Sequence, residues 1–153
     1  MGQFMDTFHV DGVNHASFTV AGLDETVTFF RDCLGAEVLS VFRPPSPDGI
    51  RRITGVSDAQ VRIAFLRMQQ QTIELLEYEQ PEARQAQQPR PCDPGFAHLA
   101  INVRGVAEFC EKARDFGYER VGDIVEMRGG PDIGKHAVYL QSASGITLEV
   151  IGL

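Results

Sequence analysis

The chain has 153 residues, enough for one domain or for two fused half-domains that share a core. Its 14 Lys and Arg residues against 21 Asp and Glu residues give a formal net charge of −7, which argues against nucleic acid as a partner because phosphates attract basic side chains. No apolar run approaches the ~20 residues that cross a bilayer, and residues 1–10 lack a secretory signal pattern, so we expect a cytoplasmic protein that binds no membrane.

The first half of the chain, residues 12–79, predicts the element order βαβββ. A β-rich run over 13–20 opens it, and further β-type runs follow at 37–42, 61–68 and 72–78. Between the first two runs, a helix that ends before Gly35 is predicted by apolar residues at helical spacing, which are Leu23, Val27, Phe30 and Leu34. The stretch 44–55 is long for a hairpin connection and predicts a loop of the kind that often covers a site.

The second half, residues 95–153, predicts the same order after a proline-containing linker at 80–94. Its predicted strands cover 96–103, 120–127, 136–141 and 147–151, and a second long loop covers 128–134. A helix that ends before Gly117 is predicted by the stripe Val106, Phe109, Ala113 and Phe116. The predicted fold class is therefore α+β, with two tandem βαβββ modules.

The two halves also carry the same chemistry in the same order. Residues 13–20 align with 96–103 without a gap, and this alignment places His15 on His98. Residues 72–76 align with 147–151 and place Glu74 on Glu149, while Phe65 just upstream falls on Tyr139. Matched positions in an internal repeat are a stronger signal than any one of these residues alone.

Each of these residues has an ordinary explanation when it is taken singly. A lone strand histidine is often only hydrogen-bonded, and a strand glutamate can face solvent, as we expect for Glu77, which alternates away from Glu74. A carboxylate in an apolar strand is costly to bury without compensation. Finding two His and two Glu at matched positions favours one site for a divalent ion such as Zn, Ni, Co, Mn or Fe, with positions left for two adjacent substrate oxygens.

Several segments resemble a known family. Residues 13–37 combine a histidine strand with Phe29-Phe30-Arg31-Asp32-Cys33-Leu34-Gly35, which is similar to the "F-Y-R-D-x-L-G" helix end of vicinal-oxygen-chelate proteins, the glyoxalase/bleomycin-resistance/dioxygenase group. The hairpins that carry Glu74 and Glu149 and the opening at 94–98 resemble the same family, over residues 12–151. The resemblance implies a curved mixed sheet around a metal, held at the four ligand positions of glyoxalase I by His15, Glu74, His98 and Glu149. It also implies a homodimer whose sites lie within one chain or are shared between chains.

The resemblance implies a metal-dependent isomerase, epimerase or lyase that acts on a small molecule with adjacent oxygens. Glu149 is the preferred catalytic base and Glu74 the second candidate. Methylmalonyl-CoA epimerases resemble this pattern but commonly have Gln at the position of Glu74 and an acidic residue before the third strand, where this chain offers only Asp48. A branch with cyclitol epimerases is also similar, so a sugar-like ketone is a candidate substrate. The alternatives are an Fe(II) ring-cleaving dioxygenase and a metal-free binding protein of the bleomycin-resistance type.

Overall fold

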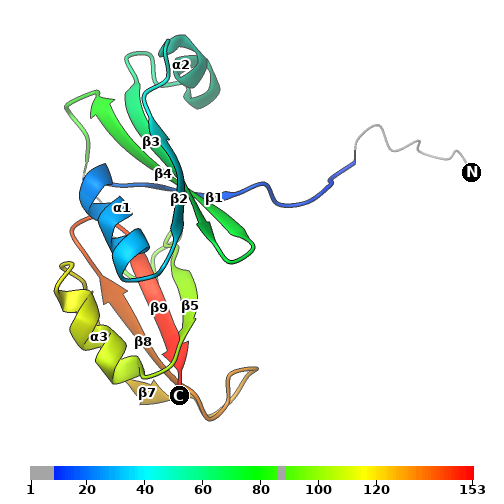
Figure 1. The fold of residues 1–153 in the computed structure, drawn as a ribbon, viewed down its shortest axis with the longest axis vertical. Helices are drawn as coiled ribbons and strands as arrows, with labels where there is room; N and C mark the ends of the chain where they lie inside the picture. The colour runs from blue at the N-terminus through cyan, green and yellow to red at the C-terminus, as the bar shows by residue number, and fades with distance from the viewer. Residues whose placement is uncertain (1–8, 86–88) are drawn as a thin grey trace, which may run out of the picture.

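The computed structural model describes residues 9–85 and 89–153, which form two mixed sheets (Figure 1). The first sheet has the order β1-β4-β3-β2, with β1 parallel to β4 and the other pairs antiparallel. Its strands are β1 (Ala16–Thr19), β2 (Glu37–Phe42), β3 (Gln60–Met68) and β4 (Gln71–Gln80). Helices α1 (Leu23–Asp32) and α2 (Asp48–Thr54) complete what we call the first module, residues 16–80.

The second module, residues 99–152, repeats this plan around one helix. Its sheet has the order β5-β9-β8-β6, with β5 parallel to β9, and β7 also pairs with β8. The strands are β5 (Leu99–Val103), β6 (Glu119–Arg120), β7 (Val125–Glu126), β8 (His136–Gln141) and β9 (Thr147–Gly152), and the helix is α3 (Val106–Arg114). The predicted α+β class is confirmed, with the mixed sheet present as two separate sheets.

Two local predictions were wrong. The stretch 44–55 is not all loop, because α2 occupies most of it and ends at Thr54, and the following Gly55, with a positive φ of 74°, closes the last turn. The predicted strand 120–127 is split into β6 and β7, because Gly122 and Asp123, which favour turns over strands, interrupt the β-type run. No helix in the described residues is long and apolar enough to span a bilayer.

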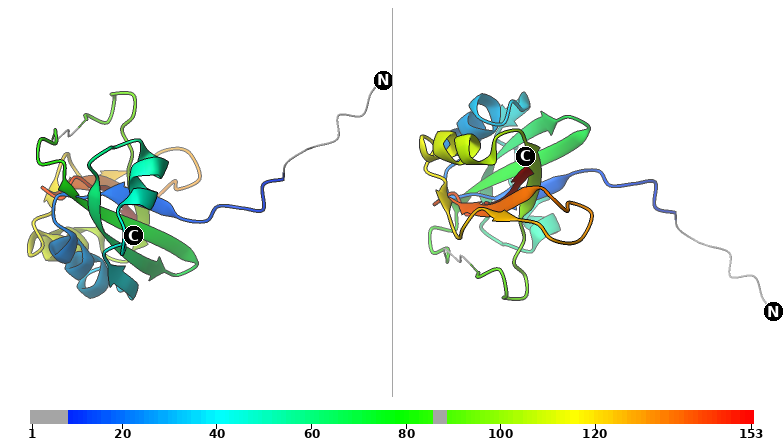
Figure 2. Two further views of the ribbon diagram at one scale, coloured as in Figure 1. Left: turned by 90° about the horizontal axis from the view of Figure 1, so that it is seen from above. Right: turned by 90° about the horizontal axis from the view of Figure 1, so that it is seen from below.

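Both long helices lie on the same side of the two sheets (Figures 1 and 2), and buried side chains of these helices and of the strands form the core. Strand alternation supplies the sheet side of this core: Ile73 and Leu75 of β4 are buried, and so are the matching Leu148 and Val150 of β9. The opposite faces of the strands are left free of helices α1 and α3, and the candidate site residues lie there.

The modules share one core at their junction. The ring of Phe29 from α1 is only 1% exposed and stacks on the Tyr118 ring at a centroid distance of 4.1 Å. The Phe116 ring lies 5.6 Å from the Phe29 ring between centroids, and the Ala21 N–H donates to the Ser144 carbonyl oxygen at 3.1 Å. This packing fixes the two modules relative to each other from the helix side.

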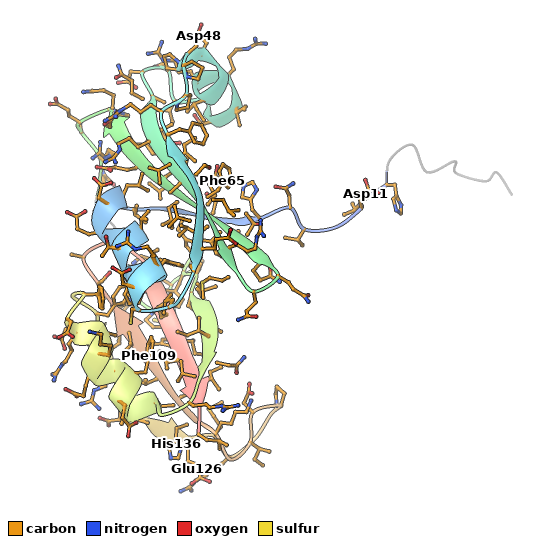
Figure 3. All side chains as sticks on the ribbon, in the orientation of Figure 1. Asp11, Asp48, Phe65, Phe109, Glu126 and His136 are labelled. Carbon is orange, nitrogen blue, oxygen red and sulfur yellow. The ribbon has the colours of Figure 1, made fainter. Side chains whose placement is uncertain are left out.

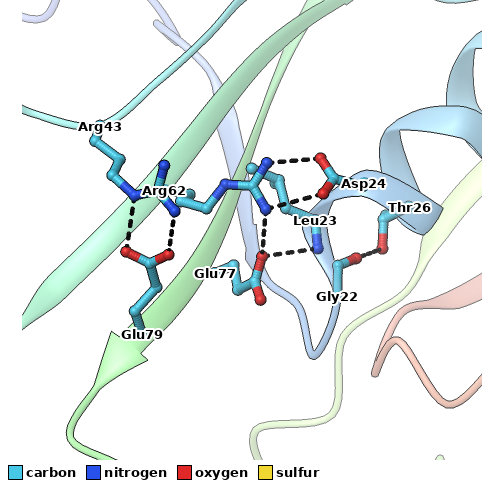
Figure 4. A network of polar contacts seen from close by, with 8 residues as sticks. All are labelled: Gly22, Leu23, Asp24, Thr26, Arg43, Arg62, Glu77 and Glu79. Carbon is cyan, nitrogen blue, oxygen red and sulfur yellow. Dashed lines mark hydrogen bonds and ion pairs between the residues drawn. The ribbon is translucent and has the colours of Figure 1, made fainter.

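Glu77 has the structural role that its alternation predicts (Figure 4). Its carboxylate accepts a hydrogen bond from the Leu23 N–H at 3.1 Å, which satisfies a free donor at the start of α1. Arg62 lies 3.4 Å from the same carboxylate and donates two hydrogen bonds to Asp24, at 2.6 and 3.0 Å. The hydrogen bond from Arg62 holds the pKa of Asp24 below its ordinary value, so this cluster fastens α1 to the sheet through charge.

Candidate metal and catalytic site

The first half-site is the pair His15 and Glu74. Glu74 is the register partner of Ser17 in β1, and His15 lies two residues before Ser17, so both side chains project from the same face. The His15 Nε2 lies 3.3 Å from a Glu74 carboxylate oxygen, with 32% of the histidine and 15% of the glutamate side chain exposed. The other ring nitrogen, Nδ1, is 2.6 Å from the Asn14 side-chain oxygen.

The second half-site, His98 and Glu149, has the same construction. Glu149 is the register partner of Ala100 in β5, and His98 lies two residues before Ala100. The His98 Nε2 lies 3.0 Å from a Glu149 carboxylate oxygen, and both side chains are part-buried. In each pair an imidazole nitrogen therefore lies close to a carboxylate oxygen, and both are groups that bind divalent ions of the first transition series.

An aromatic ring stands beside each pair. Phe65 of β3 is the register partner of Glu74, and its ring lies 5.9 Å from the His15 ring on the side of the sheet away from α1 (Figure 3). Tyr139 of β8 is the register partner of Glu149, and its ring lies 5.1 Å from the His98 ring. Desolvation, with a contribution from the Glu149 charge, raises the pKa of Tyr139.

The chain brings the four predicted ligands together as two pairs and not as one set of four. Among the described residues, no group of three or more His, Cys, Asp or Glu side chains lies close enough to hold a metal ion. The two pairs stay apart because one pair belongs to each sheet. The modules contact each other on the helix side, whereas the pairs lie on the opposite faces of the sheets. Asp48 joins neither pair: it opens α2 at the far end of the first module, 78% exposed and 3.7 Å from Arg51 (Figure 3).

Two features of the half-sites did not follow from the sequence reasoning. Asn14, next to His15, orients that ring, and the signal available was only an amide beside a candidate ligand. Tyr139 enters the second half-site, and its place opposite Phe65 in the repeat was the signal that could have found it.

Comparison with known proteins identifies the family. The sequence profile of the Glyoxalase/Bleomycin resistance protein/Dioxygenase superfamily matches residues 12–150. The chain belongs to this superfamily. It is 37% identical over 145 residues to a "2-epi-5-epi-valiolone epimerase" from Actinomyces sp., an alignment that covers 92% of this chain and 79% of the relative.

Solved structures share the fold. A glyoxalase family protein from Bacillus cereus superposes with a TM-score of 0.81 at 19% identity, over 97% of both chains. The fosfomycin resistance protein FosX from Listeria monocytogenes, in a structure with Mn(II) and a sulfate ion, gives a TM-score of 0.56 at 16% identity, over 95% of this chain and 94% of that one. At these identities the likeness establishes the fold of the chain, and its chemistry has to be argued from its own residues.

Proposed function

We propose that this protein is a metal-dependent epimerase that inverts a carbon next to the carbonyl group of a small polyhydroxylated ketone. The observation that carries the proposal is the duplicated His–Glu pair, built at the same register position in both modules. Membership of the superfamily and the epimerase name of a relative with 37% identity support the reaction type.

The donor set fits a divalent ion of the first transition series. Two imidazole nitrogens and two carboxylates are mixed N and O ligands of the kind that Zn, Ni, Co, Mn and Fe(II) accept. His15, Glu74, His98 and Glu149 would hold the ion. When bound, it would polarise the substrate carbonyl and so make the neighbouring C–H bond more acidic.

We further propose that a complete site takes the first pair from one copy of the chain and the second pair from another. The shared core at Phe29 and Tyr118 opposes a rearrangement within one chain, because closing the two pairs on each other would break that packing. A twofold dimer would instead form two equivalent sites without disturbing it. This arrangement makes the protein a homodimer.

The two carboxylates then have complementary roles. The Glu149 carboxylate takes the proton from the carbon next to the carbonyl, and the electron pair moves toward the carbonyl oxygen. The Glu74 carboxyl group, protonated while it is not acting as a ligand, returns a proton to the opposite face of that carbon and so gives the epimer, with no net change in atoms. A further proton transfer, from Glu149 to Glu74 through solvent, restores the starting state.

Deuterium exchange tests the function directly. With 2-epi-5-epi-valiolone, the ketone in the name of the relative, we expect deuterium from D₂O to enter at the carbon next to the carbonyl. Chelation should abolish the exchange, and Mn, Ni, Co, Zn or Fe(II) should restore it. Metal should also raise the free energy of unfolding by about 2.7 kcal/mol at 100 times the Kd, which is observed as a higher melting temperature. A metal-loaded protein that exchanges no polyhydroxylated ketone would remove the proposal.

A further inference from the structure

The aromatic neighbours of the two half-sites differ in one functional group. Phe65 and Tyr139 occupy equivalent places, each as register partner of the half-site glutamate and each beside the half-site histidine. Only the second half-site therefore carries a hydroxyl at this place. The Phe96 ring packs 6.0 Å from the rings of both His98 and Tyr139, which holds the phenol in position.

The Tyr139 hydroxyl is available to a ligand. It forms no hydrogen bond to another described residue. In the described part of the chain, every buried side-chain N or O atom has a hydrogen-bond partner. A hydroxyl without such a partner is therefore not buried, and that of Tyr139 reaches solvent. The buried Tyr118 is a contrast, since its hydroxyl is engaged with Ser144 at 3.5 Å. A phenol that is part-buried along its ring but open at its oxygen is suited to donate to a ligand oxygen.

We propose that Tyr139 is the residue that orients the substrate, donating a hydrogen bond to the substrate oxygen on which negative charge develops when Glu149 takes the proton. This inference rests on the proposed function. The donor lies beside Glu149 and not beside Glu74, so the carbonyl end of the substrate is directed to the second half-site. A donor placed where charge develops lowers the barrier more than it tightens ground-state binding.

The repeat supplies matched variants for the test. Tyr139→Phe gives the second half-site the ring of the first, and Phe65→Tyr adds a hydroxyl beside the other pair. We expect Tyr139→Phe to keep its metal content and melting temperature while kcat for deuterium exchange falls ~10²–10³-fold. The double variant should stay as slow as Tyr139→Phe, because its hydroxyl lies beside the first pair and not beside Glu149.

A binding measurement separates this inference from the proposed function. Acetohydroxamate presents two adjacent oxygens, one of them anionic, and its affinity for metal-loaded protein can be measured by calorimetry whether or not any ketone turns over. Binding should weaken ~10-fold or more in Tyr139→Phe, and adding Phe65→Tyr in the double variant should not restore it. Equal affinity of wild type and Tyr139→Phe for this probe would overturn the role of Tyr139, and so would unchanged exchange in metal-loaded Tyr139→Phe.

Discussion

The first and second half-sites share their donors but differ in what surrounds them. Each places a His Nε2 within 3.3 Å of a Glu oxygen at the same position in the register. In the first, Asn14 holds the histidine and the neighbouring ring is Phe65; in the second, Ala97 stands in the place of Asn14 and the ring is Tyr139. The first half-site is thus built to orient its histidine for metal binding, and the second to contact a substrate, although the repeat gives both the same backbone.

Replacing one carboxylate at a time by an amide should reveal the largest difference between the two half-sites. Glu149→Gln keeps the side-chain shape but cannot accept a proton, so deuterium wash-in should fall ~10²–10⁴-fold. Starting from the epimer whose proton faces Glu149, Glu74→Gln should still allow wash-in but slow inversion, because the second proton donor is lost. NMR of the product in D₂O reports both processes. Equal loss of wash-in in the two variants, at full metal content, would contradict the assignment of Glu149 as the base.

The junction that separates the half-sites can be weakened through Phe29. Phe29→Ala removes a buried ring that stacks on Tyr118, and we expect a loss of about 3–5 kcal/mol in the free energy of unfolding. Phe109→Ala on α3 is the matched control, since Phe109 is only partly buried against the same core and should cost less. Urea unfolding measures both. A similar, small loss in each would show that the Phe29 stack does not fix the modules.

The difference between Asn14 and Ala97 gives a smaller prediction. Asn14→Ala removes the side chain that meets the His15 Nδ1, and loss of such a supporting hydrogen bond typically lowers metal affinity ~10–100-fold. Ala97→Asn places the same amide beside His98 and should not weaken metal binding. Competition titrations with a chelator give both affinities. Unchanged affinity in Asn14→Ala would mean that strand geometry alone orients His15.

The smallest expected effect concerns the charged cluster that belongs to the first module alone. The pKa of Asp24 is depressed in the folded protein, so its ion pair stabilises above the ordinary value of 3.8, and that contribution is lost as pH falls through the depressed pKa. Arg62→Gln should therefore lower the melting temperature slightly at neutral pH, and the gap to wild type should narrow below pH 3.8. Melting curves across this range check the sign. A gap that widens in acid would be inconsistent with the ion pair.

The sequence was sufficient for features that depend on local periodicity. Alternation placed Glu74 and Glu77 on opposite faces, and the repeat identified β4 and β9 as equivalent strands of the two modules. It was insufficient where three-dimensional packing decides. The length of 44–55 predicted a loop where α2 forms, and the alignment could not show which His meets which Glu. The separation of the pairs follows from the contact of Phe29 with Tyr118, residues distant in sequence whose meeting no local pattern predicts.

The central claim is that two copies of the chain complete one site, and a mixing experiment tests it most directly. One variant carries His15→Ala and Glu74→Ala, and the other carries His98→Ala and Glu149→Ala. Each alone should lack tightly bound metal and deuterium exchange. After subunit exchange in a 1:1 mixture, half of the dimers should carry one intact site, which restores about a quarter of the wild-type sites in both metal content and exchange. A mixture that forms mixed dimers but recovers neither would contradict a site shared between copies.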